Sequence, residues 1–264
     1  MHIKFKKRLG QNFLFDKNVQ RNIIAACDFS QNDLVLEIGA GKGELTCLIA
    51  DTKAKVLALE IDSQLCKILK ENLQNYSNVK IINQDILKFN LKKCFGKSKT
   101  KLKVIGNIPY YITTPILQYL IRFRDKIESI FITVQKEFAK RILATRGSKD
   151  YSSFSCFIQY YTRPQIKFVV KKTCFQPSPK IDSCFLRLEI KRKTPLKKSK
   201  ESQLFNLIRT AFNKRRKTLR NSLKGIIPQK KLKKFFRIYN IDPDIRPERL
   251  SLGDFINLTC LDNN

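Results

Sequence analysis

Length, composition and charge limit what this chain can be. Its 264 residues can hold one sizeable core with a smaller second domain. The 53 Lys and Arg against 22 Asp and Glu leave a formal charge of +31. Such an excess repels itself in a compact chain, so it favours a polyanionic partner, with a merely solvated basic surface as the alternative.

The cysteines and the single histidine argue against several kinds of site. The eight cysteines are scattered without a Cys-x-x-Cys pair, which favours reduced thiols over zinc ligands or disulfides. The only histidine is His2, so we expect no metal site and no histidine-based acid–base chemistry. No run reaches the roughly 18 apolar residues of a membrane span, and the basic start at 2–8 does not resemble a targeting peptide. We therefore expect a cytoplasmic protein with no membrane partner.

In chain order, apolar β-branched runs alternate with helical patterns, which predicts a parallel sheet with crossover helices. Buried strands are expected at 34–38, 56–60, 79–83, 103–106 and 129–135. Helices are expected at 43–51 and 63–74, where apolar residues recur at helical spacing. Two further strands, at 165–171 and 183–191, are expected to form an antiparallel edge.

The composition changes at 191–200, where almost nothing is left to bury, and we interpret this segment as a linker. Beyond it the patterns are only helical, with one apolar stripe made by Leu204, Leu207, Ile208, Ala211 and Phe212. Ser251 followed by Asp254 predicts a capping box that opens a last helix through Leu261. The expected fold class is α/β, with a Rossmann-like domain at 1–193 and a small all-α domain at 194–264.

A glycine-rich segment, Glu-Ile-Gly-Ala-Gly-Lys-Gly at 37–43, ends the first strand and opens a helix. It lets the backbone approach a nucleoside ligand closely. Nicotinamide, flavin and S-adenosylmethionine sites share such a pattern, and a plain tight turn uses glycines too. Glu37 favours S-adenosylmethionine, because a methionine amine and a sulfonium want nearby oxygens whereas a pyrophosphate is repelled by a carboxylate.

Two carboxylates follow the next strands. Glu60 ends the second strand, where its carboxylate is placed to accept both ribose hydroxyls of a nucleoside cofactor. Asp85 follows the third strand, where it is placed to accept from an adenine amine. Either acid alone is typical of a solvated strand end, but together they fall where open α/β sheets bind ligands. The predicted cofactor is S-adenosyl-L-methionine.

The segment Asn107-Ile108-Pro109-Tyr110 follows the fourth strand and resembles the Asn/Asp-Pro-Pro-Tyr motif of methyltransferases that modify exocyclic amines of bases. An adenine 6-amino group is a poor nucleophile, because its lone pair is delocalised into the ring. The Asn107 side-chain oxygen and the Ile108 carbonyl are placed to accept its two hydrogens and direct the lone pair at the methyl carbon. Pro109 stiffens the loop, and Tyr110 stacks on the flipped-out base, which contributes about 1–3 kcal/mol. A plain turn with a packed aromatic is the alternative.

Five motifs in order, at 9–14, 37–43, 60–62, 83–85 and 106–110, resemble the ribosomal RNA adenine dimethyltransferase superfamily over nearly the whole chain. The resemblance implies cofactor contacts from Asn12, Leu14, Gly39, Glu60, Asp85 and Asn107. It also implies that Phe175 helps Tyr110 to sandwich the target base. Two departures, Tyr111 in place of the usual Asn and Ser152 in place of the usual Gly, are expected to reshape the rim that selects RNA.

Two branches of the superfamily compete. Segments 135–141, 147–151, 175–183 and 211–223 resemble the small-subunit branch, which dimethylates two adjacent adenosines in the 3′-terminal hairpin of small-subunit rRNA. The other branch modifies one large-subunit adenosine and confers macrolide resistance. The resemblance implies an enzyme that acts on the immature 30S subunit and is linked to ribosome assembly, and we expect a monomer. A DNA adenine methyltransferase and a protein that chiefly binds immature subunits are the remaining alternatives.

A cluster of cations follows the first apolar stripe beyond the linker: Lys214, Arg215, Arg216, Lys217 and Arg220. We expect these residues on a helix, since Leu219 and Leu223 continue an apolar stripe beneath them. A packed helix that presents cations outward suits a phosphate backbone, whose contacts position RNA without reading its sequence. A solvated face is the alternative.

Overall fold

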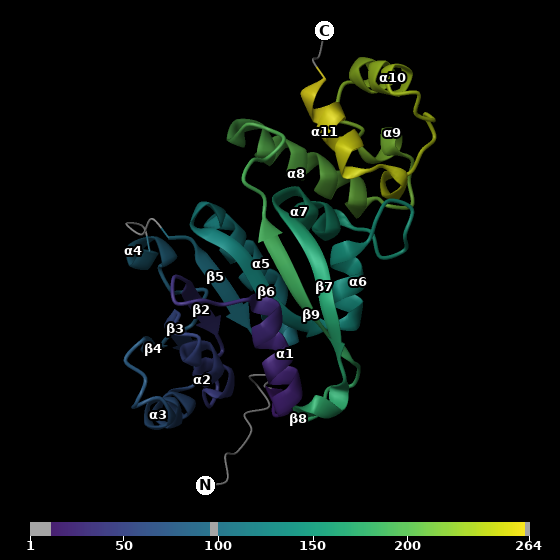
Figure 1. The fold of residues 1–264 in the computed structure, drawn as a ribbon. Coiled ribbons are helices and arrows are strands. Elements are labelled where there is room, and N and C mark those ends of the chain that lie inside the picture. Colours follow the sequence, from purple (N-terminus) through teal and green to yellow (C-terminus); the bar gives the residue numbers. More distant parts are fainter. Residues whose placement is uncertain (1–11, 96–99, 262–264) are drawn as a thin grey trace. The chain divides into compact units, whose positions relative to one another are not determined.

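The computed structural model describes residues 12–95 and 100–261 (Figure 1). The basic arm at 2–8 and the first residues of the 9–14 motif, Leu9, Gly10 and Gln11, lie outside the described residues. The chain groups into two compact units, one of Met1–Ala139 with Pro164–Ile190 and the other of Lys140–Arg163 with Lys191–Asn264. We call them unit 1 and unit 2.

A seven-stranded sheet with the order β4-β3-β2-β5-β6-β9-β7 forms the centre of unit 1 (Figure 1). The parallel strands are β2 (Leu34–Ile38), β3 (Lys55–Glu60), β4 (Val79–Asn83), β5 (Leu102–Gly106) and β6 (Ile127–Gln135). All five predicted strands are therefore confirmed. The strand β9 (Ser183–Ile190) pairs antiparallel with β6, and β7 (Thr162–Val170) lies beside β9 at the edge.

Helices cover the sheet because each buries one apolar stripe. Unit 1 contains α1 (Lys17–Cys27), α2 (Glu44–Asp51), α3 (Ser63–Asn72), α4 (Leu91–Phe95) and α5 (Thr113–Arg122). On one face of the sheet, Ile23 of α1 and Ile49 of α2 pack in a cluster with the strand residues Val35, Ile105 and Phe131. A two-stranded ribbon of β1 (Phe13–Leu14) and β8 (Phe175–Gln176) contributes to the same cluster.

Short 3₁₀ turns connect several elements: η2 (Tyr110–Ile112), η3 (Arg124–Lys126), η4 (Lys172–Cys174) and η5 (Pro247–Arg249). The helix α6 (Lys136–Leu143) carries the chain from unit 1 to unit 2. No helix within 12–95 and 100–261 has the length and apolar character that crossing a bilayer requires.

Unit 2 is helical, with α7 (Ser153–Tyr161), α8 (Lys198–Asn213), α9 (Leu219–Ser222), α10 (Gln229–Ile238) and α11 (Leu252–Cys260). The predicted stripe on α8 is buried at Leu204, Leu207, Ile208 and Ala211. The predicted capping box is confirmed, because the Ser251 hydroxyl accepts from Asp254 N at 3.1 Å while the Asp254 carboxylate accepts from Ser251 N at 2.8 Å. Each bond satisfies a backbone N–H that a helix start leaves open.

The boundary between the compact units differs from the predicted domain boundary at 193/194. Residues 140–163 group with the C-terminal helices, because the aromatic face of α7 packs on α8. The Phe205 ring centroid lies 5.4 Å from that of Phe157 and 5.2 Å from that of Tyr160, and the Tyr161 hydroxyl donates to Glu201 at 2.9 Å. The role of 194–264 as a domain that docks RNA stays a prediction.

Gly43 is a point where the fold requires glycine. Its φ is +92°, and a Cβ there would lie 2.8 Å from Cδ1 of the fully buried Leu69. Gly225 offers a matched control, since its φ is +82° but a Cβ would meet nothing within 4 Å.

We expect Gly225→Ala to lower the free energy of unfolding by about 1 kcal/mol, the cost of a left-handed backbone alone. The steric overlap should raise the loss for Gly43→Ala to about 2–4 kcal/mol in urea unfolding, and equal losses would contradict this explanation.

Candidate active site

A pocket opens at the carboxyl ends of the central strands of unit 1. The strand order reverses direction between β2 and β5, because β3 and β4 follow on one side of β2 and β6 follows β5 on the other. Open α/β sheets bind their ligands at such a point. The space within the pocket, counted together with the open solvent at its mouth, is about 1110 Å³. The pocket therefore lies at the place where sheets of this kind hold a nucleoside ligand.

The structure brings most of the predicted site residues together at this pocket. Its lining includes Asn12, Leu14, Gly39, Glu60, Asp85, Asn107, Ile108, Pro109 and Tyr110. They come from β1, from the ends of β2 and β3, and from the loops that follow β4 and β5. Because parallel strands end at the same edge of a sheet, segments far apart in the chain meet here.

The glycine-rich loop is held against the end of β3 by main-chain hydrogen bonds. Gly39 N and Ala40 N both donate to the Leu59 carbonyl, at 2.8 and 3.1 Å. Gly41 has a φ of +60°, and a Cβ on it would lie 3.3 Å from the Phe13 ring. A side chain at position 41 would therefore require the Phe13 ring to shift by a few tenths of an ångström and would strain the left-handed backbone.

Glu60 is buried and fixed by two backbone donors. Its Oε2 accepts from Gly41 N at 2.8 Å, and its Oε1 accepts from Asp62 N at 2.9 Å. Burial raises the pKa of Glu60, and these two N–H donors oppose the rise. Each carboxylate oxygen has a second lone pair, so the group can still accept from the hydroxyls of a ligand.

Glu37 is the second buried acid of the pocket. Only 3% of the residue is exposed, and its Oε2 has no hydrogen-bond partner among the described residues. Burial raises the pKa of Glu37 to about 8, the nearby Thr46 side chain opposes the rise, and the negative charge of Glu60 adds to it. An acceptor buried without a donor carries a desolvation cost, so this oxygen is an open position for a ligand amine.

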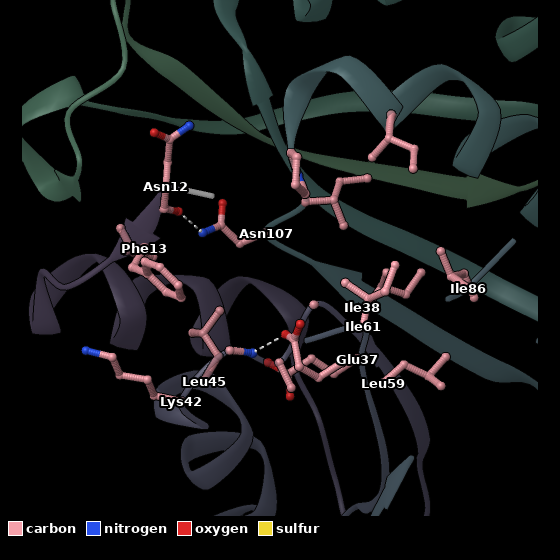
Figure 2. Close-up of a pocket in the computed structure, with 18 of the residues that line it drawn as sticks. Asn12, Phe13, Glu37, Ile38, Lys42, Leu45, Leu59, Ile61, Ile86 and Asn107 are labelled. Atoms are coloured by element: carbon pink, nitrogen blue, oxygen red, sulfur yellow. Dashed lines mark hydrogen bonds between the residues drawn. The ribbon is translucent and has the colours of Figure 1, made fainter. Parts of the chain in front are cut away.

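The side-chain amide of Asn107 has a defined orientation. Its Nδ2 donates to the Asn12 carbonyl at 3.0 Å, shown by a dashed line in Figure 2. A carbonyl can only accept, so the contact assigns nitrogen to this side and leaves Oδ1 as an acceptor on the other. Within the described residues, no hydrogen bond uses Asn107 Oδ1 or the Ile108 carbonyl. The loop therefore presents two open acceptors, the number that an exocyclic amine requires.

Tyr110 completes this end of the pocket. Its ring is half-buried, and its hydroxyl lies 2.8 Å from the Ser183 hydroxyl. Burial raises the pKa of Tyr110, so the phenol keeps its proton at neutral pH. The ring is thus a neutral aromatic surface beside the two acceptors.

Apolar side chains that the sequence reasoning missed line the opposite side of the pocket. Figure 2 shows Leu59, Ile61 and Ile86 gathered away from Asn12 and Asn107. Ile61 is 52% exposed, and Ile61 and Ile86 each follow directly after a predicted acidic site residue. Their positions directly after Glu60 and Asp85 are the sequence signal by which these apolar pocket residues could be found. Asp85 itself accepts from Leu87 N at 2.9 Å, which fixes the turn after β4.

Phe175 is not brought to the pocket. It is 2% exposed, pairs with Leu14 in the β1–β8 ribbon and packs in the cluster with Ile23 and Cys27. The ring has no open face for a base in this structure, so its placement does not support the stacking role that the resemblance implies. The reason is tertiary, because pairing with β1 turns this side chain into the core.

The two departures from the family pattern lie in different places. Tyr111 is 65% exposed and lines the pocket beside Tyr110. Ser152 is the N-cap of α7, where its hydroxyl accepts from Ser155 N at 3.3 Å. Tyr111 is therefore placed to shape the rim of the pocket, while Ser152 stabilises a helix start in unit 2.

The predicted cation cluster lies in unit 2, but not on one helix. The helix α8 ends at Asn213, and the four cations at 214–217 occupy the turn before α9, with Arg220 on α9. The helix expected here is thus wrong, whereas Leu219 and Leu223 are fully buried as predicted. Arg215 is held within the unit, because it donates to Lys149 O at 2.9 Å and to Ser148 O at 3.3 Å. Lys214, Arg216, Lys217 and Arg220 are exposed.

Known proteins that resemble this chain are methyltransferases that act on ribosomal RNA. Residues 2–261 match the family model described as Ribosomal RNA adenine dimethylase. The chain is 41% identical to the ribosomal RNA small subunit methyltransferase A of Ligilactobacillus salivarius, over 97% of this chain and 90% of that protein. It is 42% identical to the protein of the same name from Levilactobacillus brevis, over 96% of this chain and 88% of that protein.

Two solved structures superpose over nearly the whole chain. A dimethyladenosine transferase from Plasmodium falciparum has a TM-score of 0.78 at 26% identity and covers 93% of this chain and 95% of its own. The 23S rRNA methyltransferase ErmE has a TM-score of 0.75 at 24% identity, with 94% and 98% covered, and shows the fold alone. Because the family model spans almost the whole chain and two relatives exceed 40% identity over nearly all of it, this chain belongs to the ribosomal RNA adenine dimethylase family.

Proposed function

We propose that this protein transfers methyl groups to the 6-amino groups of two adjacent adenosines in the 3′-terminal hairpin of small-subunit ribosomal RNA. The family assignment makes the chain an rRNA adenine methyltransferase that uses S-adenosylmethionine. The names of the relatives, which specify the small subunit, favour that rRNA as the substrate. The observation that carries the proposal is the pair of acceptors without a hydrogen bond to any described residue, Asn107 Oδ1 and Ile108 O, on two residues that line the pocket.

The residues present fit the cofactor. The open Oε2 of Glu37 suits the ammonium group of the methionine part, and the fixed carboxylate of Glu60 suits the ribose hydroxyls. Asp85 with Ile61 and Ile86 offers a polar edge and an apolar surface for the adenine. When bound, S-adenosylmethionine supplies the activated methyl group.

The chain's own contribution to the reaction is to orient the target amine. Asn107 Oδ1 and the Ile108 carbonyl accept its two hydrogens, which favours a pyramidal nitrogen with its lone pair directed at the reacting carbon. The bond from Asn107 Nδ2 to Asn12 O keeps the amide from rotating its donor into the site. No strong base is required, because the amine becomes acidic once its nitrogen is positively charged. Tyr110 stacks on the extruded base and keeps it in the pocket.

We propose further that the protein acts as a monomer in the cytoplasm on the immature 30S subunit, and that methylation is linked to ribosome assembly. The exposed cations of unit 2 would hold the phosphate backbone, and base extrusion would select the adenosines. Methylation of one large-subunit adenosine is the rival function, and mapping of the methylated positions in rRNA distinguishes the two.

The first test follows the acceptor at position 107. In cells that lack the wild-type protein, its reintroduction should restore dimethyladenosine at two adjacent small-subunit positions, read by mass spectrometry of rRNA digests. Asn107→Ala should lower the rate of transfer to precursor 30S particles by about 100- to 1,000-fold, because one oriented acceptor is lost. Asn78→Ala is the control, since Asn78 Nδ2 also donates to main-chain carbonyls, at 2.9 and 2.8 Å, outside the pocket. Methylation at a large-subunit adenosine instead would refute the proposed substrate.

The second test follows the charge of Glu37. Its pKa of about 8 means that the free protein holds it mostly protonated at pH 7. An ammonium beside it lowers this pKa, so binding of S-adenosylmethionine releases a proton, and affinity increases by at most about tenfold per pH unit as the pH rises toward 8. Calorimetry in buffers of different ionisation enthalpy should show this release in the wild type and in the exposed control Glu71→Gln. Glu37→Gln should lack it, and an identical proton count in all three proteins would contradict the assignment.

The third test separates the cations of unit 2. Arg216→Ala and Lys217→Ala should each weaken binding to precursor 30S particles and reduce the slope of log affinity against log salt concentration by about 1. Arg215→Ala should instead lower the melting temperature, because its two main-chain contacts and a 3.8 Å ion pair with Glu248 are lost. Lys67→Ala, an exposed lysine of α3, serves as the control for charge alone. A slope that stays at the wild-type value in the first two variants would remove this turn from the RNA surface.

A further inference from the structure

The Tyr110 and Ser183 hydroxyls join the loop after β5 to the start of β9. Their oxygens lie 2.8 Å apart, although 73 residues separate them in the chain. Ser183 is fully buried, and burial also raises the pKa of Tyr110. The contact is thus a partly buried hydrogen bond between two neutral groups, with the Ser183 side fully buried and the Tyr110 side half-buried.

Ser183 is fixed by strand pairing and by the hydrogen bonds of the preceding residue. It is the first residue of β9 and pairs with Gln135 at the end of β6. The preceding residue, Asp182, accepts from Lys136 N at 3.1 Å through its carbonyl and from Lys172 N at 2.9 Å through its carboxylate. The Ser183 hydroxyl is therefore a fixed reference point built on the sheet.

The Tyr110 side chain can rotate about two torsions, whereas the Ser183 hydroxyl is fixed by its strand. Tyr110 opens the 3₁₀ turn η2, and its half-buried ring lines the pocket. Rotation about its two side-chain torsions would swing the ring across the pocket. A hydrogen bond at the hydroxyl acts at the end of the ring farthest from the backbone, so it restrains both torsions together.

We propose that Ser183 is a positioning residue for methyl transfer, which holds the Tyr110 ring in the orientation that receives the target adenine. This inference rests on the proposed function, since it concerns the stacking surface of the same site. A ring oriented beforehand loses less conformational entropy when the base arrives and keeps the amine aligned with the acceptors of the 107–110 loop.

The test compares Ser183→Ala, Tyr110→Phe and the double variant with the wild type, on precursor 30S particles. Tyr110→Phe keeps the ring and removes only the hydroxyl. We expect each single variant to lower kcat by about 5- to 30-fold, the effect of losing one partly buried hydrogen bond. The KM for particles should stay within about twofold, because contacts to phosphates dominate RNA affinity. The affinity for S-adenosylmethionine, measured by calorimetry, should not change.

Stability distinguishes a positioning role from a merely structural one. Tyr110→Phe leaves the fully buried Ser183 hydroxyl without this partner, and Ser183→Ala leaves the half-buried Tyr110 hydroxyl without it, so each single variant lowers the melting temperature. The double variant removes both hydroxyls and should recover much of the loss. If Ser183 positions the ring, kcat of the double variant stays as low as that of either single variant. Ser129→Ala is the matched control, since Ser129 is fully buried in β6, lies outside the pocket and has no hydrogen-bond partner for its hydroxyl among the described residues.

The outcomes separate this inference from the function on which it rests. A wild-type protein that methylates no rRNA adenosine would overturn the proposed function. A wild-type protein that methylates, together with an unchanged kcat in Ser183→Ala, would overturn the positioning role alone. So would a double variant that regains kcat along with its stability, or a Ser129→Ala variant that loses as much kcat as Ser183→Ala.

Discussion

In the function that we propose, the chemistry of the site depends on the hydrogen bond from Asn107 Nδ2 to the Asn12 carbonyl. An amide side chain offers a donor and an acceptor of nearly equal size, and a half-turn of its terminal torsion exchanges them. The 3.0 Å contact with a carbonyl removes that ambiguity, because the carbonyl accepts only from nitrogen. The Asn12 carbonyl oxygen thereby fixes the orientation of the Asn107 amide, although the two residues are 95 positions apart in the chain.

The sheet makes this contact possible. The strand order reverses between β2 and β5, so the loops after these strands diverge and leave a pocket at their carboxyl ends. The β1–β8 ribbon then brings Asn12 and Phe13 over the glycine-rich loop, where the absence of a side chain on Gly41 leaves room for the Phe13 ring. Each of these segments alone is an ordinary turn or strand, and only together do they form the pocket.

The two buried acids of the pocket, Glu60 and Glu37, differ in how many hydrogen-bond donors surround them. Glu60 accepts from two backbone N–H groups, which fix both of its oxygens. Glu37 has an oxygen without any partner in the described part of the chain, and its pKa rises to about 8. Glutamate is therefore a fixed acceptor at position 60, whereas at position 37 it is mostly protonated at pH 7 and one oxygen has no donor among the residues that the structure describes, because backbone donors stabilise the charged form and desolvation disfavours it.

The sequence by itself determined the local features, since each depends on residues a few positions apart. The five parallel strands, the turn of the glycine-rich loop and the capping box at Ser251 were all predictable from periodicity and residue chemistry, whereas the roles of positions 107 and 108 stay predictions. Only the tertiary structure decided which of these features meet. Pairing with β1 buried Phe175, the end of α8 placed four predicted RNA-binding cations in a turn, and the packing of α7 on α8 drew 140–163 into unit 2. The contact of Tyr110 with Ser183 likewise spans 73 residues, and no local pattern encodes a partner at that distance.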